Sequence, residues 1–481
     1  MRSMLDERTI GTIVEEVLKK LKTRGISTRG PSATRPSPQR PRGSFGSIGE
    51  AIERAQRSQQ ELVEVSLETR RRIIEAMRRV ACEHAEELSR MAVEETGLGR
   101  FEDKVKKNLL AATRTPGLED LQPDAVSGDH GLTILERAPY GLIGSITPST
   151  NPSETVINNA IGMVAGGNSV VFNPHPSAKR TTLRTIDLLN SAIEQEGGPS
   201  DVLATIEEPS IESAQALMKH EKVRLLVVTG GGAVVREAMK SGKKVIAAGP
   251  GNPPVVVDET ADLASAGRHI VNGASLDNNI VCICEKEVIA VDGITDRLKE
   301  QMVASGAVEL KAGDIEKLRK LIIKEDRGPN RHAVTRREFV GKDASHYLEA
   351  IGIKGESRAR LVFCETPASH PFVWTELLMP VLPIVRVADV DEGIRLAKEV
   401  EQGFGHSAMM HSTNITKLSE MARSIGTTIF VKNGPCYAGL GFEGEGFTSF
   451  TIASPTGEGL TSARTFTRMR KCVLVDYFRI V

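Results

Sequence analysis

The sequence has few aromatic residues, no excess of either charge and no long apolar run. Aromatic side chains make up 4% of the 481 residues, with one tryptophan and four tyrosines, so a large aromatic-lined pocket is not expected. The 62 basic and 62 acidic residues cancel, which argues against a general nucleic-acid partner or an anionic membrane surface. No stretch approaches the roughly 18 apolar residues of a membrane helix, and the N-terminus lacks an apolar signal segment. We therefore expect neither a nucleic-acid nor a membrane partner.

The cysteine content does not indicate a disulfide-stabilised secreted protein. A chain of this length, 40% hydrophobic and 26% charged, can bury the cores of two or three sub-domains without covalent cross-links. Because no secretory signal precedes them, we expect the thiols to be reduced and the protein to be cytosolic. The six cysteines are Cys82, Cys282, Cys284, Cys364, Cys436 and Cys472.

One local absence is more informative than the composition. The turn Ala247-Ala248-Gly249-Pro250-Gly251-Asn252 carries no carboxylate. Further along the chain, the polar segment Asp277-Asn278-Asn279-Ile280-Val281-Cys282 places a cysteine where a nucleophile would stand. A thiolate is a strong nucleophile near neutral pH once its pKa is lowered. The missing carboxylate indicates that water is not the acceptor that completes the reaction.

The residues alone leave other interpretations of this cysteine open. Any single cysteine is most often a buried structural residue. If the strand expected over residues 284–291 began earlier, alternation would place Cys284 on the same side as Cys282, so the pattern does not choose between them. Cys282 and Cys284 could also form half of a metal site, but no second close-spaced Cys or His pair exists, and we expect no metal.

Strands and helices alternate through the middle of the sequence, after a helical region at residues 47–113 and an exposed strand at 132–137. This alternation predicts an α/β fold with a parallel, doubly wound sheet. A second α/β region is expected over residues 262–430, and a terminal strand over residues 471–481. The expected strands are 141–146, 169–173, 223–229, 244–247 and 255–258, and the expected helices are 155–164, 179–196 and 233–241.

The first residues form a unit of their own. Residues 1–21 have the apolar spacing of an amphipathic helix, and residues 22–46 form a linker rich in proline and basic side chains. A short helix on such a linker cannot bury its own apolar face. It is either an ordinary first helix packed on the body or, as we favour, a docking peptide for a partner.

Three further segments are candidates for ligand binding. Gly230, Gly231 and Gly232 follow a buried-type strand, as in a diphosphate-binding turn, but Val235 replaces the third glycine of the fingerprint, so a simple turn is an equal alternative. The polar turn at residues 147–152 offers donors for an oxyanion hole or a helix cap. Glu376, in an apolar stretch, could bind a sugar hydroxyl or lie at the surface.

From Ser47 to Val481 the chain resembles the aldehyde dehydrogenase superfamily. It looks most like the CoA-acylating aldehyde dehydrogenases of bacterial microcompartments, which act on acetaldehyde or propionaldehyde. The resemblance implies a Rossmann-type cofactor domain, an α/β catalytic domain and a small β oligomerisation element. The matching segments are residues 136–152, 172–179, 249–254, 278–286, 376–381 and 447–468.

The resemblance also implies roles for individual residues. Cys282 is the implied nucleophile, and Glu376 is implied at the nicotinamide ribose. Thr150 and Asn151 are the implied oxyanion donors; Thr150 occupies the slot in which hydrolytic members carry asparagine. The other implied cofactor-binding residues are Thr147, Pro148, Asn173, His175, Pro176, Thr229, Gly230, Gly231 and Gly249.

The departure from the hydrolytic members concerns the general base. They carry a Glu-Leu-Gly-Gly segment whose glutamate activates water, whereas this chain has Ala248-Gly249-Pro250-Gly251. A thioester can persist without such a base until a thiol attacks it. We therefore expect an aldehyde, coenzyme A and NAD⁺, rather than NADP⁺, to give acyl-CoA and NADH. A hydrolytic dehydrogenase and a catalytically silent cargo or scaffold protein are the alternatives.

The resemblance further implies domain limits and partners. The cofactor domain would span residues 47–121 and 139–257, the catalytic domain 258–435, and oligomerisation strands 122–138 and 456–481. A homo-dimer or tetramer is expected. Helix 1–21 would be an encapsulation peptide that binds shell or cargo proteins, which places the enzyme in the lumen of a microcompartment in the bacterial cytoplasm.

Overall fold

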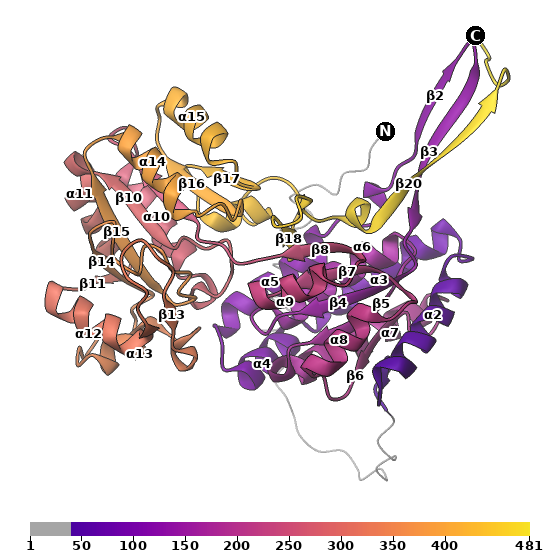
Figure 1. Cartoon of the computed structure of the whole chain (residues 1–481), viewed down its shortest axis with the longest axis horizontal. Helices are drawn as coiled ribbons and strands as arrows, with labels where there is room; N and C mark the ends of the chain where they lie inside the picture. Colours follow the sequence, from indigo (N-terminus) through magenta and orange to yellow (C-terminus); the bar gives the residue numbers. More distant parts are fainter. Residues whose placement is uncertain (1–39) are drawn as a thin grey trace, which may run out of the picture. The chain divides into compact units, whose positions relative to one another are not determined.

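A computed structural model describes residues 40–481, which form two large parallel sheets and a small antiparallel one (Figure 1). The expected helix 1–21 and the linker up to residue 39 lie outside the described residues. The first sheet has the strand order β1-β6-β5-β4-β7-β8, and every neighbouring pair is parallel. Its strands are β1 (Ser44–Phe45), β4 (Leu142–Thr147), β5 (Ser169–Pro174), β6 (Leu203–Ile206), β7 (Val223–Thr229) and β8 (Lys244–Ala248).

These strands are runs of branched apolar residues, as expected for a parallel sheet buried on both faces. Helix α6 (Pro152–Ala165) is buried at every residue, and polar members such as Asn158 and Glu154 have buried partners. Its proline at the first turn, where no backbone donor is needed, fixes where the helix begins. The other helices of this half are α2 (Ile48–Leu62), α3 (Leu67–Glu83), α4 (Ala85–Thr96), α5 (Phe101–Arg114), α7 (Lys179–Gln195), α8 (Ile211–Lys219) and α9 (Gly232–Met239).

The second sheet has seven parallel strands in the order β11-β14-β15-β10-β9-β16-β17. They are β9 (Pro254–Val257), β10 (Glu287–Val291), β11 (Ala307–Glu309), β14 (Leu361–Glu365), β15 (Val381–Val387), β16 (Ser407–His411) and β17 (Ile429–Lys432). Its helices are α10 (Leu263–Ala274), α11 (Asp292–Ala304), α12 (Ala312–Ile322), α13 (Ala344–Ala350), α14 (Val390–Val400) and α15 (Ile415–Ile425). Two short antiparallel pairs are β12 (Ile323–Glu325) with β13 (Val334–Thr335), and β18 (Ile452–Ala453) with β19 (Gly459–Leu460).

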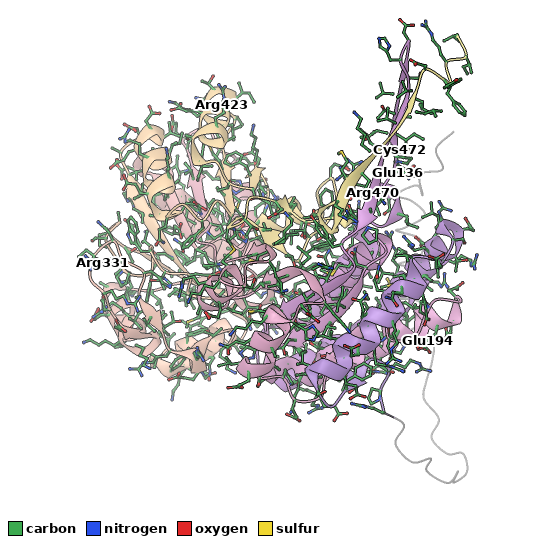
Figure 2. The ribbon with its side chains drawn as sticks, turned by 45° about the vertical axis from the view of Figure 1, so that its right-hand side comes forward. Glu136, Glu194, Arg331, Arg423, Arg470 and Cys472 are labelled. Carbon is green, nitrogen blue, oxygen red and sulfur yellow. The ribbon has the colours of Figure 1, made fainter. Side chains whose placement is uncertain are left out.

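A three-stranded antiparallel sheet joins β2 (Asp124–Gly128), β3 (Gly131–Pro139) and β20 (Thr467–Val475). Most of its residues are exposed on the chain, including apolar ones such as Val126 and Val473. Figure 2 labels Glu136, Arg470 and Cys472 along it, and the register places Glu136 directly opposite Arg470. Opposite charges at facing positions favour this register over a shifted one.

The structure confirms the predicted α/β class and the parallel, doubly wound sheet, and it corrects three details. The strand expected from residue 284 begins at Glu287, because the Lys286 amide donates to the Pro253 carbonyl oxygen just before the β9–β10 ladder begins. The terminal strand runs over residues 467–475 and not to 481, because β3 offers no partner beyond Gly131. Ser44 and Phe45, expected in the linker, are buried and pair with β6. Among the described helices, none is long and apolar enough to cross a membrane.

Candidate active site

Most of the predicted cofactor residues meet where the strands of the first sheet end, and Glu376 lies elsewhere, beside Gly251. Thr147 at the end of β4 lies beside Pro174 of β5, and Thr229 at the end of β7 lies beside Ala248 of β8. The carboxyl ends of parallel strands are where α/β proteins bind ligands. Pro148, His175, Gly230 and Gly249 directly follow these strand ends in the chain.

The polar groups at this edge are partly engaged with one another. The His175 amide donates to the Thr147 carbonyl oxygen at 3.0 Å, and its ring Nδ1 accepts from the Ser177 amide at 3.2 Å. Asn173 Oδ1 accepts from Ser213 Oγ at 2.6 Å. The Thr147 hydroxyl is buried and has no hydrogen-bond partner among the described residues.

The glycine turn at this edge presents open backbone. Gly231 is exposed, and a methyl group added to it would meet no atom within 4 Å, so internal packing does not explain the glycine. The turn leads into α9, whose first amides have no intrahelical partners. These amides fit the diphosphate of a dinucleotide. Thr229 Oγ1 is instead paired with Thr451 Oγ1 at 2.9 Å.

Helix α10 is followed by the short helix η3 (Leu276–Asn279), and Cys282 lies in the turn between η3 and β10. It is partly exposed, whereas Cys284 is fully buried, with its sulfur 3.8 Å from the Leu276 carbonyl oxygen. Because β10 begins only at Glu287, strand alternation does not relate the two cysteines. Among residues 40–481, no group of three or more His, Cys, Asp or Glu side chains is arranged to hold a metal ion.

The glycine turn without a carboxylate lies against the cysteine. A methyl group on Gly251 would stand 3.1 Å from the Cys282 carbonyl oxygen and 2.9 Å from Cγ of His406. The Gly251 amide donates to Glu376 Oε1 at 3.4 Å, which joins Glu376 to the same place. The fold therefore brings together Cys282, Gly251 and Glu376.

His406 is a residue that the sequence reasoning missed. It is fully buried, its Nδ1 is 2.8 Å from Ser407 Oγ, and its Nε2 has no partner in the described part of the chain. No sequence signal singles it out, because a lone histidine after a glycine turn is common in loops. Its closeness to Gly251 becomes visible only in three dimensions.

Although the Cys282 residue is partly exposed, the surroundings of its thiol disfavour the ionised form. Burial, and then the charge of Glu376, raise the pKa of Cys282 to about 12, although Lys286 opposes them. Burial also raises the pKa of Glu376 above its ordinary value. Burial and the nearby Lys286 lower the pKa of His406 to about 4, so this imidazole is neutral at physiological pH.

Lys286 braces the loop that carries the cysteine. Its Nζ donates to the Asn279 carbonyl oxygen at 2.9 Å, to Asn279 Oδ1 at 2.6 Å and to the Val281 carbonyl oxygen at 3.4 Å. Asn279 Nδ2 in turn donates to the carbonyl oxygens of Ala274 and Glu285 at 2.7 and 2.9 Å. A buried ammonium is stable here because all its donors face oxygen atoms.

The predicted oxyanion turn precedes α6. Asn151 is the N-cap residue, and its Oδ1 accepts from Lys107 Nζ at 2.5 Å. Its Nδ2 lies 3.3 Å from Thr150 Oγ1, and the Thr150 carbonyl oxygen accepts from Lys104 Nζ at 3.0 Å. The amides of the first helical turn and the Asn151 amide group are the donors that this turn offers.

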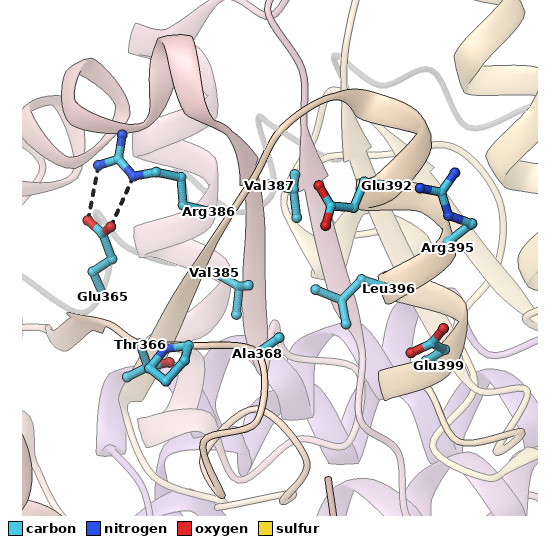
Figure 3. A pocket seen from close by; sticks show the side chains of 11 residues that line it. Glu365, Thr366, Ala368, Val385, Arg386, Val387, Glu392, Arg395, Leu396 and Glu399 are labelled. Atoms are coloured by element: carbon cyan, nitrogen blue, oxygen red, sulfur yellow. Dashed lines mark hydrogen bonds and ion pairs between the residues drawn. The ribbon is translucent and has the colours of Figure 1, made fainter. Parts of the chain in front are cut away.

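A cavity of about 600 Å³ lies away from these residues, between β14, β15 and α14 (Figure 3). The ion pair between Glu365 and Arg386 closes one side of it, with Arg386 Nε 3.0 Å from Glu365 Oε1. Glu392, Arg395 and Glu399 from α14 line the other side. None of the predicted site residues lines this cavity, so it is separate from the cysteine.

Comparison with known proteins places these features in context. A model of the aldehyde dehydrogenase family matches residues 19–440. Acetaldehyde dehydrogenase (acetylating) EutE of Salmonella typhimurium is 50% identical over 99% of this chain and 100% of its own length. Propionaldehyde dehydrogenase of Rhodopseudomonas palustris, solved with bound CoA and an acylated cysteine, is 49% identical, with a TM-score of 0.88 over 90% of this chain and 98% of that one. Propionaldehyde dehydrogenase from the fucose utilisation bacterial microcompartment of Clostridium phytofermentans is 46% identical, with a TM-score of 0.89 over 92% and 100%.

Proposed function

Because the chain belongs to the aldehyde dehydrogenase family, we propose that it oxidises a short aldehyde with NAD⁺ and transfers the acyl group to coenzyme A. One observation carries this proposal: the turn against Cys282 has no ionisable side chain from Ala248 to Gly251. A site that lacks a base in this position is poor at activating water against a thioester. The acyl thioester on the enzyme is therefore hydrolysed slowly and persists until a thiol attacks it.

Cys282 is the nucleophile of the proposed reaction. It is the partly exposed cysteine of the loop, whereas Cys284 is sealed in the core. Its thiolate adds to the aldehyde carbon, a carbon–sulfur bond forms, and the carbonyl oxygen becomes an oxyanion. The Asn151 amide group and the first amides of α6 are the donors assigned to that oxyanion, with Thr150 in the same turn.

The oxyanion then collapses to a carbonyl, and hydride leaves the same carbon. When bound, NAD⁺ would supply the hydride acceptor and a positive ring that would favour the thiolate of Cys282 over the thiol. What remains is an acyl group on the cysteine sulfur. The sulfur of coenzyme A attacks this thioester after losing its proton to water or a base, and Cys282 leaves as a thiolate.

The strand-end residues are assigned to the dinucleotide. The open amides after Gly231 suit the diphosphate, Thr147 is assigned to the same strand-end region, and Glu376 suits the nicotinamide ribose. The remaining residues of this assignment are Pro148, Asn173, His175, Pro176, Thr229, Gly230 and Gly249. The cofactor domain is assigned to residues 47–121 and 139–257, and the catalytic domain to 258–435.

Product analysis with and without coenzyme A tests the proposal. With acetaldehyde or propionaldehyde and NAD⁺, we expect continued NADH formation only when coenzyme A is present, and acyl-CoA in equal amount. Without it, NADH should stop near one equivalent per active site. Continued NADH and free acid without coenzyme A would indicate a hydrolytic enzyme, and no NADH under either condition would indicate a silent cargo protein.

The exposed three-stranded sheet supports a homo-oligomer. Apolar side chains such as Val126, Met469 and Val473 are more than half exposed on a single chain, and a second copy would cover them. The oligomerisation strands are assigned to residues 122–138 and 456–481. Light scattering distinguishes a dimer from a tetramer, and a monomer would contradict this assignment.

A microcompartment lumen in the bacterial cytoplasm is the proposed location. The sequence of residues 1–21 suits a docking peptide, and the relative from Clostridium phytofermentans is named for such a compartment. Deleting residues 1–21 should leave kcat unchanged and abolish co-purification with shell proteins. Retained co-purification would show that the targeting signal lies outside residues 1–21.

A further inference from the structure

Three consecutive residues in the loop that leads to the nucleophile adopt an unusual backbone conformation. Asp277, Asn278 and Asn279 have φ values of 46°, 55° and 64°, and none of them is glycine. L-residues rarely adopt this left-handed conformation, and a run of three persists only where the surroundings fix it. The loop that carries Cys282 is therefore held in place by contacts rather than by its own preference.

Asp277 ties this segment to helix α5 and to the residue that precedes it. It is fully buried, and its Oδ1 accepts from the Arg100 amide at 2.6 Å. Its Oδ2 accepts from Lys104 Nζ at 3.0 Å and lies 2.6 Å from Lys107 Nζ. A methyl group on Gly99 would stand 2.1 Å from Asp277 Oδ1, so the glycine makes room for the carboxylate.

The same two lysines hold the turn before α6. They are three residues apart on α5 (Figure 1) and therefore share one face of that helix. Lys104 Nζ donates to the Thr150 carbonyl oxygen at 3.0 Å, and Lys107 Nζ donates to Asn151 Oδ1 at 2.5 Å. Lys107 also pairs with the buried Glu154 of α6 at 3.1 Å. One helix face thus joins the cysteine loop to the proposed oxyanion turn.

We propose that Asp277, Lys104 and Lys107 are positioning residues that set the Cys282 sulfur at its working distance from the donors of the Thr150–Asn151 turn. The inference rests on the proposed acyl-transfer function, because it requires both groups to act on one carbonyl carbon. Two lysines facing the carboxylates of Asp277 and Glu154 balance in charge, which allows the group to be buried. Burying these charged groups costs free energy, but it fixes the distance between the cysteine loop and the turn before α6, which apolar packing could not do.

The charges support this role. Burial would raise the pKa of Asp277, but Lys104 and Lys107 outweigh it and hold that pKa below its ordinary value. Burial would lower the pKa of Lys107, but Asp277 and Glu154 outweigh it and raise that pKa. Both partners of this pair are therefore charged at neutral pH.

The test compares stability with the rate of the chemical step. Asp277→Asn keeps the shape of the side chain but removes its charge, and Asp277→Asn with Lys107→Gln removes one charge of each sign. We expect the double variant to recover the thermal stability that the single variant loses. In both, kcat and the single-turnover NADH rate should fall roughly 10²-fold with the aldehyde KM within threefold, because a small displacement of reacting groups is costly.

Lys107→Arg covers the case in which the first variants do not fold, since it keeps the positive charge in a longer side chain. It should lower the melting temperature less than Asp277→Asn does, because the charge balance is kept, and lose roughly 10-fold in kcat. The matched control is Lys299→Met, which breaks an ion-pair group with Glu309 and Glu365 elsewhere in the protein. Its kcat should equal the wild-type value.

Either of two results overturns the proposal. One is a wild-type kcat in folded Lys107→Arg, and the other is a double variant in which kcat returns together with stability. Failure of the proposed function is distinguishable, because it would appear in the wild-type enzyme as NADH formation that does not need coenzyme A. The single-turnover NADH rate would still report on positioning in that case.

Discussion

The carboxyl-terminal edge of the first sheet, where its strands end, and the loop around Cys282 are built in opposite ways. At the edge, strand register alone brings Thr147, Pro174, Thr229 and Ala248 side by side, and the backbone beyond them is open. At the loop, left-handed residues are fixed by buried ammonium and carboxylate groups. A dinucleotide must enter and leave in each turnover, whereas a nucleophile must stay in one place. The contrast teaches that the open region tolerates small changes and the packed one does not.

The largest effect should separate two cysteines of the same loop. Cys282→Ala should reduce NADH formation by roughly 10⁴-fold or more, because the acyl group loses its point of attachment. Cys284→Ala removes only a small buried group, which should cost about 1 kcal/mol of stability and leave the rate within threefold of wild type. Steady-state assays with urea unfolding check both, and an inactive Cys284→Ala with active Cys282→Ala would reverse the assignment.

Glycine substitutions compare the two regions directly. Gly251→Ala forces a methyl group against His406 and the Cys282 carbonyl oxygen, so we expect kcat to fall roughly 10²-fold through displacement of the loop. Gly231→Ala meets nothing within 4 Å in the protein, so it should change only the KM for NAD⁺. Kinetics with each substrate varied in turn are the measurement. Equal losses of kcat in both variants would mean that the two regions are not built differently.

The packed region around Cys282 also contains a buried carboxylic acid, Glu285. Burial raises the pKa of Glu285 to about 7, from an ordinary value of 4.5, although the Cys436 amide donates to it at 2.8 Å. A raised folded-state pKa contributes stability that is complete below pH 4.5 and is lost as the pH rises through 7. The wild-type protein should lose about 2 kcal/mol of unfolding free energy between pH 5 and pH 8, and Glu285→Gln should lose less.

Urea unfolding at the two pH values measures this difference. The exposed Glu338→Gln serves as the control and should follow the wild type. A Glu285→Gln protein with the full wild-type pH dependence would assign the loss to another group.

The smallest effect concerns Glu376, which lies against Gly251 and acts on Cys282 through its charge. Because the Glu376 charge raises the pKa of Cys282, Glu376→Gln should lower it and give more thiolate at a given pH. In the absence of nucleotide, alkylation by iodoacetamide should become up to roughly 10-fold faster at pH 8, with its pH profile moved to lower values. The pKa should stay above its ordinary value, since burial is the larger cause. A profile that moves to higher pH would contradict this.

The same contrast explains what could be predicted from the sequence. The strands β4, β5, β7, β8 and β9 were predictable because each is a buried apolar run with a turn after it. The edge residues followed, since parallel strands align their ends. Family spacing, and not strand alternation, selected Cys282.

The packed loop could not be predicted in the same way. In the sequence, Lys104 and Lys107 belong to a charged helix that looks like any solvent-exposed helix. Their partner Asp277 is 173 residues from Lys104 along the chain. His406 had no motif, and β1 is two residues long. Contacts between such distant residues depend on tertiary packing, which periodicity does not encode.

Strand β1 has a mechanical consequence. It forms one edge of the six-stranded sheet and β8 forms the other, and β1 is paired only through Ser44 and Phe45. A force applied through the chain before residue 40 would first load the contacts of Arg42 with Asp187 and Glu194, and then the short β1–β6 pairing, before it reached β4, β7 or β8. A protein fused at this end would therefore load the edge of the sheet before the central strands that carry the predicted cofactor residues.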